Sequence, residues 1–190
     1  MVALLIATEL HPSRKALMKY CPQCAKPLMR LPLGGRERPA CPDARCGFVH
    51  WNNPIPVVAA IVEHEDHVAL VRNVGWPEHW FGLVTGFLES GEMPEEGVLR
   101  EVQEELGLAA ELKSYVGMYE FYRSNQLLIA YHVTVPSKEV KLDRHEIADS
   151  KWVHIEEVKP WTAGTGKALR DWLRQRGIER EMVDFDRVKY

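Results

Sequence analysis

The chain has 190 residues, of which 46% are hydrophobic and 27% are charged, and its net charge is −3. This length and composition fit one globular catalytic domain with a small accessory module. The slight negative charge excludes attraction of the whole protein to nucleic acid or to an anionic membrane, and leaves local basic patches open.

Residues 1–19 are expected to form a loosely ordered tail. The apolar run Met1–Ala7 is too short to span a bilayer, and no basic segment precedes it as in a secretory signal. We therefore expect a cytoplasmic protein that does not associate with membranes. Met18 is an alternative natural start to Met1.

All four cysteines lie within a short segment and form two closely spaced pairs, Cys21 with Cys24 and Cys41 with Cys46. Two such pairs, separated by a hairpin-sized spacer, are typical of a closed, structural Cys₄ Zn²⁺ site. Two disulfides are the alternative, which a reducing cytoplasm disfavours. A redox role for the first pair would need a surrounding βαβ pattern, which is missing. We therefore predict a zinc ribbon over residues 20–50.

The predicted ribbon is locally basic. Its arginines are Arg30, Arg36, Arg38 and Arg45. This charge suits a polyphosphate or an RNA, although a scattered set of surface arginines is the simpler interpretation.

Residues 51–180 are expected to form the catalytic domain, after a linker rich in proline and asparagine. Apolar and β-branched runs predict a hairpin of two strands at 57–63 and 68–72, and further strands at 81–87, 111–123, 127–135 and 152–154. Helices are predicted from Pro94 to Gly107 and over 168–176. Strands, a helix, more strands and a second helix indicate an α+β layered domain.

The first predicted helix carries an acidic face. Glu101, Glu104 and Glu105 have the spacing that places side chains on one side of a helix, where like charges repel. Arg100, the one cation within the helix, is expected to neutralise one of them at most. A glycine-punctuated loop at Gly86 and Gly91 precedes the helix and lets backbone approach a ligand closely. This combination predicts a site for a hard divalent cation, Mg²⁺ or Mn²⁺, and a phosphate.

The segment from Gly86 to Leu108 resembles the complete signature of the Nudix hydrolases. Gly86, Glu92 and the run REVQEELGL from Arg100 fill every fixed position. The resemblance implies an α/β/α sandwich with a mixed sheet and a metal-dependent enzyme that cleaves phosphoric anhydride bonds.

The resemblance also implies roles for individual residues. Arg100 would orient the glutamates, and the carbonyl of Thr85 would complete the metal shell of Glu101, Glu104 and Glu105. Glu92 would support the loop, and Glu89 is an occasional ligand in the family. A further carboxylate often comes from the loop before the last strand, which here nominates Glu146 as a fourth ligand or general base. An exposed loop glutamate is its simpler interpretation.

A zinc ribbon followed directly by this signature resembles the NADH pyrophosphatase branch of the family. Trp51 lies where that branch places an aromatic residue that stacks on the substrate base, and packing at the domain junction is its alternative role. The chain lacks the SQPWPFP stretch of that branch and has Met118–Gln126 there instead. Tyr119 and Phe121 are the remaining candidates for base stacking, with strand packing as the alternative. NADH, FAD, ADP-ribose, dinucleoside polyphosphates and an NAD-capped RNA end stay open as substrates.

Two other functions compete with nucleotide diphosphate hydrolysis. A regulator that binds a nucleotide or nucleic acid on a Nudix scaffold usually lacks signature glutamates, and this chain lacks none. An enzyme that removes oxidised nucleoside triphosphates needs no zinc module. The expected partner is therefore a small nucleotide derivative, with nucleic acid limited to a capped RNA end. By analogy with two-module relatives we expect a homodimer.

Overall fold

The structure, a computed structural model, describes residues 18–187. The predicted tail lies outside the described residues, apart from Met18 and Lys19. Contacts divide the described chain into two units, one ending at Pro54 and the other beginning at Ile55. Neither helix within residues 18–187 is long and apolar enough to cross a membrane.

The first unit is built on a two-stranded antiparallel hairpin of β1 (Met29–Leu33) and β2 (Arg36–Ala40). Gly34 and Gly35 form its turn with φ angles of 58° and 74°. Positive φ at both central residues is the requirement of a tight hairpin turn, and glycine meets it without steric cost. This hairpin separates the two cysteine pairs, as their spacing predicted.

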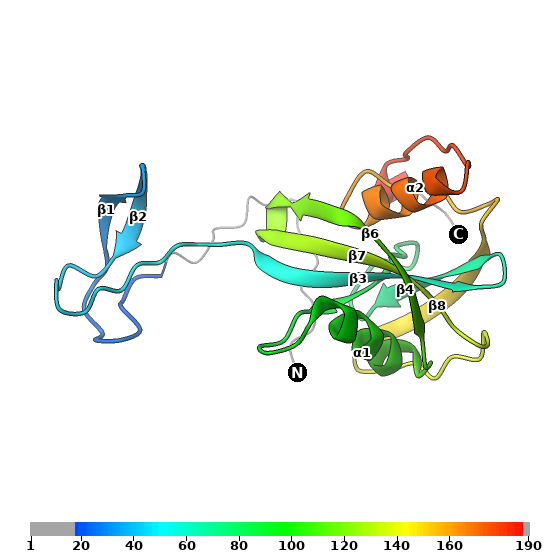
Figure 1. Ribbon diagram of the computed structural model, residues 1–190, viewed down its shortest axis with the longest axis horizontal. Helices are drawn as coiled ribbons and strands as arrows, with labels where there is room; N and C mark the ends of the chain where they lie inside the picture. The colour runs from blue at the N-terminus through cyan, green and yellow to red at the C-terminus, as the bar shows by residue number, and fades with distance from the viewer. Residues whose placement is uncertain (1–17, 188–190) are drawn as a thin grey trace. The chain divides into compact units, whose positions relative to one another are not determined.

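The second unit is a mixed sheet with a helix on each face (Figure 1). Its elements are β3 (Ile55–His64), β4 (His67–Asn73), β5 (Val84–Phe87), α1 (Pro94–Leu106), β6 (Glu111–Phe121), the 3₁₀ turn η1 (Tyr122–Ser124), β7 (Gln126–Thr134), β8 (Ile147–His154), α2 (Gly166–Gln175) and the 3₁₀ turn η2 (Phe185–Arg187). The strand order is β6-β7-β3-β4-β8, and β5 also pairs with β3. β3 and β7 are parallel, whereas the other pairs are antiparallel.

The core lies on both faces of the central strand β3. Val98, Val102 and Leu106 of α1 pack on one face, and Leu169, Trp172 and Leu173 of α2 belong to a cluster on the other. Burying each such side chain stabilises the fold by about 1.5–3 kcal/mol. The apolar stripe of α1 therefore fixes the position of its acidic face.

Each predicted strand is found, with ends that differ by one or two residues in four of them, whereas the other two begin three or more residues from their predicted start. The strand predicted at 81–87 begins at Val84, because Gly82 makes only an isolated bridge to Val71 of β4 before the chain crosses to β3. The strand predicted at 152–154 begins at Ile147. Its extra residues pair with β4 at the edge of the sheet, and their polar side chains lack the apolar alternation that marks a strand.

An ion pair between the buried Glu63 and the partly exposed Arg176 joins β3 to the end of α2. Glu63 is 8% exposed, and Arg176 donates from Nη1 and Nη2 to its two oxygens at 2.6 and 2.7 Å. His132 Nε2 lies 2.6 Å from Glu63 Oε2. Burial raises the pKa of Glu63, but hydrogen bonding and attraction to Arg176 outweigh it, so the pKa lies below its ordinary value.

Arg176→Met is expected to destabilise the protein by about 2–4 kcal/mol, because it leaves a buried carboxylate without its cation. Urea unfolding at pH 7 measures this change. The contribution should be complete above pH 4.5, the ordinary pKa, and should be lost as the pH falls through the lowered pKa of Glu63. Arg174→Met removes an exposed pair with Glu179 and should change stability by less than about 1 kcal/mol. Equal losses in the two variants would contradict the expectation.

Candidate active site

The three predicted carboxylates of α1 differ in how far they are exposed to solvent. The helix begins at Pro94 and its last residue is Leu106; Gly107, with a left-handed φ of 68°, caps it, which confirms the predicted start and stop. Glu105 is 3% exposed and Glu101 is 8% exposed. The Glu104 side chain is 57% exposed. Two of the three carboxylates are therefore buried, and the third faces solvent.

β5 brings backbone directly against Glu101. A Cβ atom added to Gly86 would lie 1.8 Å from Glu101 Cδ, so the carboxylate occupies the space that any other residue would fill. Thr85 precedes this glycine, is buried, and pairs with Ala59 of β3. The glycine was expected to let the backbone approach a ligand closely. In the structure, Gly86 makes its close contact with the Glu101 carboxylate.

Arg100 contacts more glutamates than the sequence indicated. Its Nη1 donates to Glu101 Oε1 at 2.7 Å and to Glu104 Oε2 at 2.8 Å. Its Nε donates to Glu92 Oε1 at 2.8 Å. Its single positive charge still offsets one glutamate at most, but the guanidinium has several donors and reaches back over the loop.

The loop before α1 is tied to Arg100 in two places. Arg100 Nη2 donates to the Phe87 carbonyl and to Glu92 Oε2, both at 3.1 Å. Glu92 also accepts the backbone N–H of Glu89, and its hydrogen bond with Arg100 lowers its pKa. Glu89 itself is exposed. The Phe87 contact could not be predicted, because every residue has a backbone carbonyl and residue identity does not show which of them accepts a hydrogen bond.

The loop that carries Glu146 is held against the end of α1. The backbone N–H groups of Lys141 and Asp143 donate to the carbonyls of Leu106 and Glu105 at 2.8 and 3.2 Å. These carbonyls have no partner within a helix, so the loop satisfies them. Glu146 follows three residues after Asp143, and its charge raises the pKa of both Glu101 and Glu105.

The buried carboxylates are electrostatically unfavourable as anions. Burial is the main cause that raises the pKa of Glu105 well above its ordinary value, followed by the charges of Glu101 and Glu146. Burial likewise raises the pKa of Glu101, against the opposing effect of Arg100. Glu105 Oε2 is buried without a hydrogen-bond partner. An unpartnered carboxylate oxygen among other carboxylates fits a hard divalent cation.

The four cysteines converge on one point. Their sulfur atoms all lie within 4.8 Å of one another, and no other set of three or more histidine, cysteine or acidic residues between 18 and 187 is gathered so closely. Cys21 and Cys46 are 3.5 Å apart at sulfur, as are Cys24 and Cys41, and all four are free thiols. Tetrahedral Zn²⁺ with Zn–S bonds of about 2.3 Å places sulfurs at a similar separation. The residues therefore fit zinc.

The three aromatic candidates differ in what they offer a base. Trp51, in the hairpin unit, is 51% exposed, and the Arg38 guanidinium lies 4.9 Å from its ring centroid. Tyr119 is buried in a cluster with Val57 and Ala168, and its hydroxyl donates to Asp171. Tyr119 therefore packs the sheet against α2, which is the alternative role that its sequence context left open. Phe121 is partly buried beside the same cluster.

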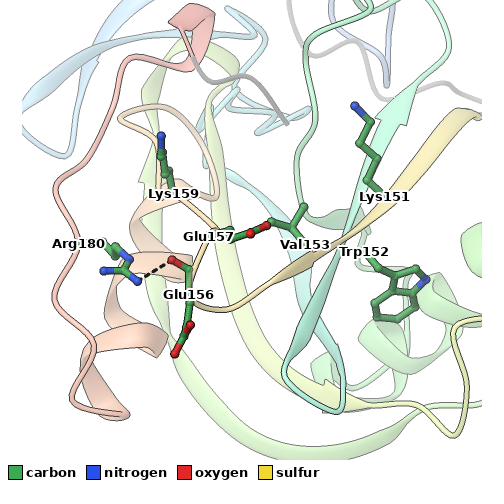
Figure 2. Close-up of a pocket in the computed structure, with 7 residues that line it drawn as sticks. All are labelled: Lys151, Trp152, Val153, Glu156, Glu157, Lys159 and Arg180. Atoms are coloured by element: carbon green, nitrogen blue, oxygen red, sulfur yellow. Dashed lines mark hydrogen bonds between the residues drawn. The ribbon is translucent and has the colours of Figure 1, made fainter.

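A hollow of about 810 Å³ is lined by residues of β8 and of the segments after it and after α2, and none of them was predicted as a site residue (Figure 2). Its lining is Lys151, Trp152, Val153, Glu156, Glu157, Lys159 and Arg180. Arg180 Nη2 donates to the Glu156 carbonyl within it. Both basic and acidic side chains line the hollow, and no residue predicted as a site residue is among them. The carboxylates, and not the size of a cavity, therefore locate the candidate site.

A family model and individual known proteins both match this chain. The sequence model of the NUDIX domain matches residues 53–173. The NAD-capped RNA hydrolase NudC of Vibrio vulnificus (strain CMCP6) is 30% identical over 166 residues, which cover 83% of this chain and 59% of that protein. The protein of the same name from Mycobacterium tuberculosis (strain ATCC 25618 / H37Rv) is 33% identical over 117 residues, covering 61% and 36%. The chain thus spans less than two thirds of the length of these relatives.

A solved structure shares the fold. The crystal structure of a NUDIX hydrolase from Nitrosomonas europaea superposes with a TM-score of 0.70 at 22% identity, covering 88% of this chain and 99% of that one. This likeness, together with the mixed sheet and the cysteine hairpin, confirms the fold class predicted from the sequence.

Proposed function

Because the chain belongs to the Nudix hydrolase family, we propose that it hydrolyses the diphosphate linkage of a nucleotide derivative. The products would be a nucleoside monophosphate and a second phosphorylated compound. NADH, FAD and ADP-ribose represent the substrate class. The observation that carries the proposal is the pair of buried carboxylates, Glu101 and Glu105, held beside the Gly86 backbone and Arg100.

Glu101, Glu104, Glu105 and Glu146, with the Thr85 carbonyl, are the proposed holders of Mg²⁺ or Mn²⁺. The unpartnered Oε2 of Glu105 supports this assignment. A bound ion would supply an activated water and neutralise charge on the phosphate oxygens. Arg100 would keep the glutamates oriented, and Glu92 would hold Arg100. The four cysteines would hold a structural Zn²⁺.

A panel of dinucleotides incubated with the protein and Mg²⁺ tests the proposal, with both products identified by mass spectrometry. Wild-type protein should release a nucleoside monophosphate from at least one compound, and EDTA should abolish the release. Glu104→Gln should reduce it, whereas Glu111→Gln, which alters an exposed acid on β6, should not. Failure to cleave any member would refute the proposal. Pyrophosphate release from a triphosphate would favour the enzyme that removes oxidised nucleotides.

An NAD-capped RNA end is the second candidate substrate. Residues 18–54 carry six lysines and arginines against two acids, net +4, whereas residues 55–190 carry sixteen against twenty-four, net −8. A basic module attached to an acidic domain suits an extended anionic chain. A capped RNA of about ten nucleotides should then be cleaved with a lower KM than NAD, and the advantage should diminish as salt rises. Equal KM values would leave the small nucleotide as substrate.

Three broader assignments complete the proposal. Residues 20–50 would act as the zinc module and 51–180 as the hydrolase, in a cytoplasmic homodimer. Light scattering coupled to gel filtration tests the dimer. Salt-dependent binding of RNA without turnover would instead support a regulator on the same scaffold.

Gly86→Ala is expected to lower hydrolysis by roughly 10- to 100-fold with little loss of stability. The added methyl group must displace the Glu101 carboxylate, the mobile end of a side chain, and misplacing a reacting group carries costs of this size. Steady-state kinetics and thermal unfolding measure the two effects. In a Glu101→Gln background the same change should cost much less, since the two substitutions affect one group. Fully additive losses would contradict this explanation.

A further inference from the structure

The side chain of Arg72 is without a hydrogen-bond or ion-pair partner in the part of the chain that the structure describes. Arg72 is the second-last residue of β4, and its Nε is buried without a hydrogen-bond acceptor. Among the partly buried arginines within residues 18–187, the others each donate to a carboxylate or a carbonyl: Arg38, Arg100, Arg170 and Arg180. By contrast, no hydrogen bond or ion pair joins the Arg72 side chain to another residue in that range, although its backbone pairs with Asp149 in the β4–β8 ladder.

The net charge of the domain makes it unexpected that the Arg72 side chain lacks an acidic partner. Residues 55–190 have a net charge of −8, so acidic partners are abundant. Asp149 is directly opposite Arg72 in the β4–β8 ladder, yet its Oδ1 accepts the N–H of Ser150. Arg72 as a whole is partly buried, and among its side-chain nitrogens Nε is the one that is buried without a partner. A buried donor without an acceptor is costly, so an acceptor from outside the chain would stabilise this arrangement.

The position of Arg72 indicates where such an acceptor would lie. The ladder shifts register immediately after it, and two residues later the N–H of Val74 donates to the Glu146 carbonyl at 2.7 Å. Two strand positions correspond to about 7 Å. Arg72 thus lies at the same end of the sheet as the proposed ligand Glu146. Its side chain projects from the same face of β4 as Leu70, the α2 face, whereas the glutamates come from α1.

We propose that Arg72 binds a phosphate oxygen of the substrate diphosphate, opposite the carboxylates that hold the metal. The inference rests on the proposed function and adds a contact to it. A planar guanidinium suits a phosphate group because it can donate two parallel hydrogen bonds. In a domain with so much negative charge, it also supplies the attraction that an anionic substrate needs.

The test compares wild-type full-length protein with Arg72→Met, Arg72→Lys and the matched control Arg174→Met, after thermal unfolding shows that each variant is folded. Calorimetric titration with ADP in EDTA measures phosphate binding without metal. Arg72→Met should weaken ADP binding roughly tenfold or more relative to wild type and Arg174→Met. Arg72→Lys should recover part of the loss, because it keeps the charge and loses the paired donors. Adenosine, which lacks phosphate, should bind all four proteins equally.

Kinetics with the best dinucleotide of the panel provide a second measurement. Arg72→Met should raise KM about tenfold with a much smaller change in kcat, the pattern of a lost binding contact. Wild-type cleavage with equal kinetics for Arg72→Met and Arg174→Met would overturn the Arg72 inference and keep the hydrolase. ADP binding that depends on Arg72 without cleavage of any dinucleotide would reject the hydrolase and keep the Arg72 site. ADP binding no tighter than adenosine binding in wild type would overturn the inference.

Discussion

Glu105→Gln is expected to lower Mg²⁺-dependent hydrolysis by at least about a hundredfold while leaving the fold at least as stable. Electrostatic groups at a reacting centre are worth about this much when removed singly. Glu105 is 3% exposed, with one oxygen lacking any partner, and an amide of the same shape avoids burying that charge. Function and stability should therefore change in opposite directions at this position.

Kinetics with saturating Mg²⁺ and thermal unfolding in EDTA measure these two changes. Glu111→Gln is the control, because its side chain is exposed on β6 and forms an ion pair with Lys113. A variant that is both active and unchanged in metal affinity would show that Glu105 is not a ligand. A variant that is less stable in EDTA would show that its carboxylate is better satisfied than its contacts indicate.

Loss of metal from the cysteine cluster is expected to unfold the hairpin unit and to leave the second unit folded. Between residues 18 and 54 the buried residues are Cys21, Ala40 and Cys41, so no apolar core holds this unit together. Zinc binding contributes roughly 10–16 kcal/mol in peptides of this kind, and that free energy is folding free energy. Cys41→Ser removes one of its two buried thiolates.

Metal content and limited proteolysis measure this effect. Wild-type protein should contain one zinc per chain, and Cys41→Ser should contain much less. Trypsin should then cut at Arg30 and Arg36 in the variant while the core of the second unit resists. Ala44→Ser, an exposed change in the same loop, should behave as wild type. A metal-free hairpin that still resists trypsin would contradict the expectation.

The acidic helix and the cysteine hairpin were predictable because local chemistry determines both. Pro94 and Gly107 mark the ends of α1 by backbone conformation alone, and the cysteine spacing already implied a shared ion. The family resemblance drawn from the same segment is confirmed by the domain match and by the NudC relatives.

The contacts between distant segments were not predictable from the sequence. Residue identity indicates that Arg100 is cationic but not that its side chain reaches Glu92 and Phe87 across a turn. Tyr119 is aromatic and could stack on a base as far as its identity shows. Its hydroxyl donates a hydrogen bond to Asp171 because α2 packs on β6, which the sequence does not reveal. The isolation of Arg72 is likewise a property of the folded sheet. The assignment of individual site residues remains a prediction for the variants above.

The parallel pairing of β3 with β7 affects how the chain matures on the ribosome. Ile55 pairs with Gln126, about 70 residues later in synthesis. At about 5–20 residues per second, the central strand waits several seconds or more with an unfilled edge. The cysteine hairpin emerges first and needs only its own residues and an ion. The hairpin can therefore fold during that delay. The exposed edge of β3, in contrast, must be protected from aggregation until β7 has been synthesised.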